Sequence, residues 1–244
     1  MDEQSKQFSD GWFIFGDPRF QPLLDGHQST PQWLPLGQAG SLGYMDHQTT
    51  NLHAMLIVDS RLTGSFFLVS RAIWEPSYPP WVKLNVDGAS HGNPGPSGAG
   101  GVFRDHQATF LLGFSCNTSH NTNTFAEFYG LFRGIAIWFE THPHFQGSIW
   151  IESDSTLVVN TIKGLVSANT QVQPFVLHTL KLLDLLREWK ITHIFREGNM
   201  SADKLASLGL GLPSETIFDR PPTALAHFLN EDANEVPQFR FPKS

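Results

Sequence analysis

Residues 82–104 read VKLNVDGASHGNPGPSGAGGVFR, and this stretch decides the fold. Apolar and polar side chains alternate over its first five residues, which is typical of a half-buried strand, and Asp87 stands where that strand ends. The turn over residues 92–98 contains three glycines and two prolines, so it cannot be a helix. Residues 99–104 and 109–116 predict two further strands, which completes a three-stranded antiparallel meander. The first strand of the predicted sheet therefore ends in an acidic residue.

The chain after this meander predicts alternating helices and strands. Residues 125–139 place apolar side chains three and four positions apart, the period of an amphipathic helix, and Glu127 lies in its first turn. An apolar strand over residues 148–152 follows, and Asp154 comes shortly after it. The remaining elements are expected to be a short helix over 155–162, a long helix over 174–189, a strand over 191–195 and a last helix over 201–208 that contains Asp203. This order predicts an α/β domain whose five-stranded mixed sheet, with three antiparallel and two parallel strands, is flanked by helices.

The regions on either side of this core have weaker patterns. Residues 1–75 contain many Pro, Gly and Gln and few periodic apolar stretches, so we expect an irregular or poorly ordered extension with at most two short strands. The prolines at positions 76, 79 and 80 predict a stiff, extended joint, and we place the domain at residues 76–212. Residues 213–244 are rich in proline and acidic residues, and they predict a C-terminal tail without a clear core pattern.

Composition limits the classes of function. The 244 residues carry a net charge of -7, but residues 81–210 contain nine Lys/Arg and ten Asp/Glu, so most of the acidity lies in the flanks. Net acidity argues only weakly against nucleic-acid binding when it is distributed in this way. The lone cysteine, Cys116, excludes an internal disulfide and is typical of a reducing compartment. Because the sequence shows neither a membrane-spanning run nor a signal peptide, we expect a nuclear or cytoplasmic monomer that does not enter membranes.

Four acidic residues stand at the junctions of predicted elements: Asp87, Glu127, Asp154 and Asp203. Because strand ends and helix starts meet at one edge of a mixed sheet, the four carboxylates can converge. Carboxylates packed together raise one another's pKa unless a cation neutralises them. Carboxylate oxygens suit Mg²⁺ or Mn²⁺, and two such ions about 3.5 to 4 Å apart can activate a water and stabilise the leaving oxygen of a phosphodiester. The pattern therefore indicates nuclease chemistry.

Other candidate sites have simpler explanations. The glycine-rich turn at residues 92–101 lacks the following helix and the Gly-Lys-Ser of a phosphate-binding loop, so a hairpin turn fits better. His142 and His144 have one proline between them and no cysteine partners, which argues against a zinc site. Cys116 lies in a strand pattern without a nearby basic activator and predicts a buried, inert thiol. Three tryptophans fall in the apolar phases of their elements, which predicts core rather than base-stacking positions: Trp138, Trp150 and Trp189.

Ordered motifs carry a family resemblance. They read NVDGAS at 85–90 with GNPGPSGAGG at 92–101, TNT at 122–124 ahead of AE, ESDS at 152–155, and REGN at 196–199 ahead of ADKLA. Together they closely resemble type I ribonuclease H, in the version derived from plant retroelements (retrotransposons), over about residues 81–210. A weaker similarity extends to the tail at 218–222. The resemblance implies the ribonuclease H-like fold and a hydrolase that cuts the RNA strand of RNA–DNA hybrids endonucleolytically.

The resemblance also implies roles for single residues. Asp87 would bridge two Mg²⁺ or Mn²⁺ ions, Glu127 and Asp154 would hold the ion beside the leaving group, and Asp203 would hold the ion that activates water. Four residues with amide or hydroxyl side chains would contact the RNA 2′-hydroxyls and the DNA phosphate: Asn93, Thr122, Asn123 and Thr124. The implied partner is an RNA–DNA hybrid, and the implied origin is a domesticated or residual piece of a retroelement.

Two departures from the family pattern leave other functions open. Many members carry a histidine on the loop before the last helix, whereas this loop reads REGN and His193 lies earlier, so either turnover is slow or Glu197 substitutes. Residues 163–173 contain a single lysine in place of a basic protrusion, which predicts weak hybrid affinity. The alternative is therefore a catalytically weak or silent nucleic-acid-binding module with the ribonuclease H fold. A third possibility is a nonfunctional gene fragment whose first 80 residues are not a domain.

Overall fold

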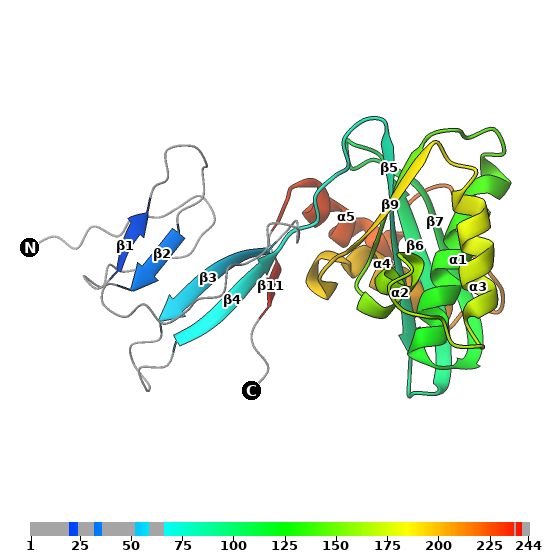
Figure 1. Cartoon of the computed structure of the whole chain (residues 1–244), viewed down its shortest axis with the longest axis horizontal. Helices are drawn as coiled ribbons and strands as arrows, with labels where there is room; N and C mark the ends of the chain where they lie inside the picture. Colours follow the sequence, from blue (N-terminus) through cyan, green and yellow to red (C-terminus); the bar gives the residue numbers. More distant parts are fainter. Residues whose placement is uncertain (1–19, 24–31, 36–51, 59–65, 237, 241–244) are drawn as a thin grey trace, which may run out of the picture. The chain divides into compact units, whose positions relative to one another are not determined.

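The computed structural model describes residues 20–23, 32–35, 52–58, 66–236 and 238–240 (Figure 1). The chain divides into two compact units, residues 1–70 with 241–244, and residues 71–240. Four strands are described in or at the edge of the first unit: β1 (Phe20–Leu23), β2 (Gln32–Pro35), β3 (Leu52–Val58) and β4 (Phe66–Ala72). β1 pairs with β2, and β3 pairs with β4. At most two short strands were predicted within residues 1–75, and this number is wrong, because β1 and β2 add a pair of four-residue strands that are too short to show a period. The rest of the predicted irregular extension up to residue 65 lies outside the described residues.

The second unit is built on a six-stranded mixed sheet with the order β10-β7-β6-β5-β8-β9. Its strands are β5 (Trp81–Ser90), β6 (Gly95–Arg104), β7 (Phe110–Asn121), β8 (Ser148–Ser153), β9 (Glu188–His193) and β10 (Thr216–Phe218). β5, β6 and β7 form the predicted antiparallel meander, and β8 and β9 extend it in parallel. β10 adds an antiparallel edge strand that the sequence did not predict, because three residues are too few to show a period.

Helices cover both faces of this sheet. They are α1 (Asn123–Thr141), α2 (Thr156–Ile162), α3 (Gln173–Leu183), α4 (Met200–Gly209) and α5 (Ala226–Ala233), with 3₁₀ turns η1 (Arg196–Gly198) and η2 (Thr223–Leu225). α1 and α3 pack together on one face, and α4 and α5 lie on the other (Figure 1). The short strand β11 (Gln238–Arg240) ends the described chain. α3 ends six residues before its predicted end at Trp189 because β9 begins at Glu188 and pairs with β8.

The main core lies between the sheet and the α1–α3 layer. Strand side chains such as Leu84, Val86 and Phe114 pack there against Leu131 and Ile135 of α1. The expected core positions of the tryptophans are confirmed, since Trp138 and Trp150 are buried and Trp189 packs against the same core. Cys116 is a buried thiol on β7, also as predicted. The packing therefore fixes the sheet against α1, which carries one of the candidate ligands.

The opposite face of the sheet is more polar. β5 directs Lys83, Asn85 and Asp87 to this face, and all three are buried. A small apolar cluster beside them joins Val102, Leu205 and Leu225. Leu225 belongs to η2, so the region after residue 212 contributes to a core that the sequence pattern did not reveal. Phe218 and Leu229 of the same region also pack against this cluster, so the prediction of a tail without a core is wrong.

Candidate active site

Two neighbouring parallel strands place two of the candidate carboxylates together. β5 and β8 pair so that Val86 lies beside Ser153, and Asp87 and Asp154 are the next residues along each chain. Adjacent strands lie about 4.8 Å apart, so the two carboxylates share one edge of the sheet. The side chain of Asp87 is buried, and its Oδ1 accepts a hydrogen bond from the Gly88 amide at 2.8 Å. This pair forms the centre of the candidate site.

A glycine lets α1 bring Glu127 to this pair. A Cβ atom at Gly88 would lie only 2.3 Å from the Glu127 amide nitrogen, so a residue with a side chain could not occupy this position without moving the helix. The Thr122 hydroxyl accepts the Phe125 amide at 3.1 Å and fixes where the helix begins. Asn123, the first residue of the helix, donates from its Nδ2 to Glu127 Oε1 at 2.7 Å. Because α1 begins two residues before the predicted start at residue 125, Glu127 lies beyond the first turn in which it was predicted. The start of α1 therefore both positions and orients Glu127.

α4 supplies the fourth carboxylate. The helix lies close to β6, where a Cβ at Gly100 would be 2.4 Å from the Ala206 amide nitrogen. The Asp203 amide donates to the Asn199 carbonyl at 3.0 Å, and Asp203 Oδ1 accepts from Arg196 Nη2 at 2.8 Å. The charge of Asp203 acts on Asp87 and on Asp154, so the four predicted ligands meet at one edge of the sheet.

Burial and mutual repulsion raise the pKa values of these acids. Burial raises the pKa of Asp87 well above its ordinary value, and the charges of Asp154 and Asp203 raise it further. Burial also raises the pKa of Glu127 to about 7. The pKa of Asp154 is raised by burial as well, although the Arg196 guanidinium opposes that shift. A bound divalent cation would relieve this repulsion and hold the carboxylates in their charged form.

The chemistry of these side chains fits Mg²⁺ or Mn²⁺, because hard oxygen donors are the ligands that these ions prefer. In the described part of the chain, no three His, Cys, Asp or Glu side chains are already arranged to hold a metal ion. One of the four carboxylates, that of Asp203, forms an ion pair with the Arg196 guanidinium, a cation of the protein itself. Arg196 is largely exposed, with 71% of its side chain accessible, so its guanidinium has room to leave Asp203.

The predicted substrate contacts gather at the β5–β6 turn and the start of α1. Asn93 Oδ1 accepts a hydrogen bond from the Asn123 amide at 3.1 Å, which joins the two segments. Thr122 is the N-cap of α1 and Thr124 lies in its first turn, both half-buried. The glycine-rich stretch is a hairpin turn between two strands, as predicted. Polar amides and hydroxyls therefore lie within one helical turn of Glu127.

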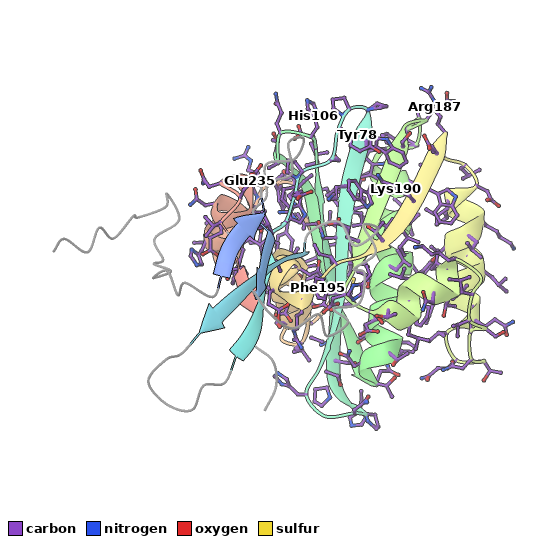
Figure 2. All side chains as sticks on the ribbon, turned by 60° about the vertical axis from the view of Figure 1, so that its left-hand side comes forward. Tyr78, His106, Arg187, Lys190, Phe195 and Glu235 are labelled. Atoms are coloured by element: carbon purple, nitrogen blue, oxygen red, sulfur yellow. The ribbon has the colours of Figure 1, made fainter. Side chains whose placement is uncertain are left out.

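β9 and the turn that follows it carry contacts that the sequence did not predict. In Figure 2, Lys190 of β9 and Tyr78 lie towards one end of the sheet, where Lys190 Nζ donates to the Tyr78 hydroxyl. Phe195, just before η1, lies further along in the same view. His193 ends β9, and its Nε2 lies 3.2 Å from the Asp154 backbone oxygen, so it contacts the backbone of this ligand. The roles of Arg196 and Asn199 were missed, although both stand in the REGN motif, because sequence spacing does not show which side chains of this turn reach Asp203 or β5.

A family model described as reverse transcriptase-like matches residues 85–209, which is half of the chain and contains all four acidic residues. The chain belongs to this reverse transcriptase-like family. Its ribonuclease H-like domain is 36% identical over 165 residues to an Arabidopsis thaliana protein named "Putative ribonuclease H protein At1g65750". That match covers 62% of this chain and 24% of the Arabidopsis protein, so the chain spans about a quarter of that relative.

Two further comparisons place this member of the reverse transcriptase-like family beside ribonucleases H. Ribonuclease HI of Halobacterium salinarum is 29% identical over 189 residues, which cover 76% of this chain and 87% of that protein. The solved N-terminal ribonuclease H domain of Rv2228c from Mycobacterium tuberculosis gives a TM-score of 0.50 at 26% identity, over 53% of this chain and 93% of that chain. The predicted ribonuclease H-like fold is confirmed. Among the described residues, no helix has the length and apolar character needed to cross a membrane.

The raised pKa of Glu127 predicts an unusual pH dependence in metal-free protein. A carboxyl whose folded-state pKa is above its unfolded value binds more protons when folded, so stability falls as pH rises between the two values. For Glu127 the window runs from 4.5 to about 7. Urea unfolding in a chelator should therefore show that the stability of Glu127→Gln relative to the wild type rises across this window, by about 3 kcal/mol in total at pH 8. A difference between the two proteins that does not change with pH would contradict this assignment.

Proposed function

We propose that the second unit is a metal-dependent endoribonuclease that hydrolyses the RNA strand of RNA–DNA hybrids. The observation that carries the proposal is the meeting of Asp87, Glu127 and Asp154 at one sheet edge with pKa values raised by burial. A protein that only needed a stable core would gain nothing from burying like charges together. Membership of the reverse transcriptase-like family and similarity to ribonuclease HI support the same chemistry.

In this proposal the four carboxylates have separate roles. Asp87 would contribute to holding both metal ions, Glu127 and Asp154 would hold the ion beside the leaving group, and Asp203 would hold the ion that activates the water. When bound, two Mg²⁺ or Mn²⁺ ions would activate the water and stabilise the leaving oxygen. Asn123 keeps Glu127 oriented through its 2.7 Å hydrogen bond. The Arg196 guanidinium neutralises Asp203, and because it is largely exposed it would be free to contact the negatively charged substrate if Asp203 held a metal ion.

The substrate class follows from the polar groups beside Glu127. The amide side chain of Asn93 and the residues Thr122, Asn123 and Thr124 offer donors and acceptors that suit the RNA 2′-hydroxyl and a DNA phosphate. The 2′-hydroxyl distinguishes RNA from DNA, so these contacts would select the strand that is cut. The second candidate function is a catalytically silent binding module, favoured by the absence of a histidine from the loop at residues 196–199 and by the engagement of Asp203 with Arg196.

The test is cleavage by the purified full chain. An RNA–DNA hybrid labelled on each strand in turn is incubated with Mg²⁺, with Mn²⁺ or with a chelator, beside double-stranded RNA, double-stranded DNA and the Asp154→Asn variant. We expect metal-dependent cutting of the RNA strand of the hybrid alone, which Asp154→Asn lacks. A folded wild type that binds the hybrid but cuts it with neither ion would replace the nuclease with the binding module.

A further inference from the structure

A buried polar network lies on the same face of the sheet as Asp87 and the helix α4 that carries Asp203. Lys83 and Asn85 precede Asp87 at alternate positions of β5, and Glu152 precedes Asp154 in the same way on β8. Lys83 Nζ donates to Glu152 Oε1 at 2.9 Å and to the Glu75 carbonyl at 2.7 Å. These side chains are almost fully buried, so they form the floor beneath the acidic edge.

Asn85 is the centre of this network because every hydrogen-bonding position of its amide is used. Its Oδ1 accepts from Trp74 Nε1 and from Arg104 Nη2, each at 2.8 Å. Its Nδ2 donates to Glu152 Oε2 at 3.0 Å and to Asn199 Oδ1 at 3.2 Å. A side-chain amide offers two donors and one acceptor oxygen with two lone pairs, so the orientation of Asn85 is fixed.

Asn199 transmits this orientation to the acidic residues. Its Nδ2 donates to the Val86 carbonyl at 3.0 Å, immediately before Asp87. Its backbone carbonyl accepts the amide of Asp203 at 3.0 Å, in the first turn of α4. Asn199 therefore joins the strand that carries one candidate ligand to the helix that carries another.

The C-terminal helix α5 completes the network. Arg104 is buried, with 1% of its side chain accessible, and its guanidinium lies 3.5 Å from the centre of the Trp74 ring. Arg104 Nη1 donates to Asp232 Oδ2, and the same oxygen accepts a hydrogen bond from Ser201 Oγ of α4 at 3.0 Å. Because an uncompensated buried charge costs several kcal/mol, Arg104 depends on the Asp232 carboxylate. Asp232 lies beyond residues 85–209, the span that the family model matches.

We propose that Asp232 is a positioning residue of the active site. Through Ser201 it holds the start of α4, and through Arg104 and Asn85 it fixes Asn199, so that Asp203 faces the other carboxylates. This proposal takes one assumption from the proposed function, namely that Asp203 is a metal ligand. The catalytic unit then includes α5 and the Trp74 segment, and it does not end at residue 212, the boundary predicted from the sequence.

The test compares Asp232→Asn with wild type in the full chain. Mn²⁺ binding is measured by calorimetry, hydrogen exchange of the amides in residues 200–203 by mass spectrometry, and hybrid cleavage as separate kcat and KM values. We expect about five- to tenfold weaker Mn²⁺ binding, faster exchange in the first turn of α4, and a lower kcat with a nearly unchanged KM. Ser201→Ala keeps the charges of Arg104 and Asp232 and removes only the hydrogen bond to α4. It should change the same three quantities in the same direction by a smaller amount, and it replaces Asp232→Asn as the test if that variant does not fold.

A matched control separates positioning from general stability. Glu215→Gln also removes a carboxylate of the C-terminal region from an arginine, since Glu215 binds Arg133 at 2.7 Å. The other hydrogen bonds of this pair go to Cys116 and Glu140 and not to a residue of α4. We expect Glu215→Gln to keep Mn²⁺ affinity and exchange at residues 200–203. The proposal is overturned if Asp232→Asn and Ser201→Ala lower the melting temperature but leave both quantities unchanged. If wild type does not cut hybrids, the proposed function fails, while Mn²⁺ binding and exchange still decide the role of Asp232.

Discussion

Asp87→Asn is expected to abolish hybrid cleavage, by roughly a thousandfold or more, while making the metal-free protein more stable at pH 8. The two effects have one cause. Asp87 is buried beside Asp154, and its raised pKa shows that its charged form is disfavoured in the folded protein without a cation. An asparagine keeps the shape of the side chain and can still accept the Gly88 amide with its oxygen, but it removes the charge. The variant therefore loses the central metal ligand and the repulsion together.

Thermal unfolding with and without Mg²⁺ measures the second effect. Wild type should gain stability when Mg²⁺ is added, because the ion binds the folded state alone, whereas Asp87→Asn should start higher and gain little. Asp184→Asn is the matched control, since Asp184 is an exposed acid after α3, and it should behave like wild type in both assays. A strongly destabilised Asp87→Asn protein in a chelator would show that Asp87 supports the fold instead of binding metal.

The arrangement of the central strands and helices was predictable because it depends on short-range patterns. The alternation before Asp87, the glycine-rich turn and the helical period after Glu127 all extend over enough residues to show a period, and the structure contains the corresponding strands, turn and helix. β10 and η2 were not predictable for the opposite reason. Each has three residues, and each is held by partners far away in the sequence, as Leu225 is by Val102. Their formation depends on tertiary contacts that no local pattern encodes.

In the candidate site, too, the parts that depend on local sequence patterns were predictable and the parts that depend on long-range contacts were not. The four acidic residues stood out because each was predicted to follow a strand or to begin a helix, and the structure brings them to one region of the sheet. Two of these positions were wrong in detail: β5 continues past Asp87 to Ser90, because its last residues still pair with β6, and α1 begins four residues before Glu127. The buried network beneath them did not stand out, because Lys83, Asn85 and Arg104 read as ordinary polar residues of half-buried strands. Their partners, Trp74 and Asp232, come from segments that the sequence assigned to a linker and a tail. Long-range pairing of buried polar groups is therefore the part of the site that required the structure.

Gly88→Ala is expected to destabilise the protein by about 2 to 4 kcal/mol and to reduce cleavage in the protein that remains folded. The added Cβ would lie 2.3 Å from the Glu127 amide nitrogen and 2.6 Å from the Ala126 carbonyl carbon. Both atoms belong to the backbone of α1, so the clash cannot be relieved by a change of rotamer. The helix must move away from β5, and Glu127 then moves away from Asp87. Urea unfolding gives the loss of stability, and cleavage well below the melting temperature gives the loss of kcat.

Gly211→Ala separates this clash from the general effect of replacing a glycine. A Cβ at Gly211 has no contact closer than 3.9 Å, to the Leu208 carbonyl oxygen, so we expect a change within about 0.5 kcal/mol and unchanged cleavage. If Gly88→Ala were as stable as Gly211→Ala, α1 would not approach β5 as closely as the structure describes. If it were destabilised but fully active when folded, Glu127 would not need its position beside Asp87. Either result would argue against Glu127 as a metal ligand, because the close approach at Gly88 brings the Glu127 backbone next to the residue that follows Asp87.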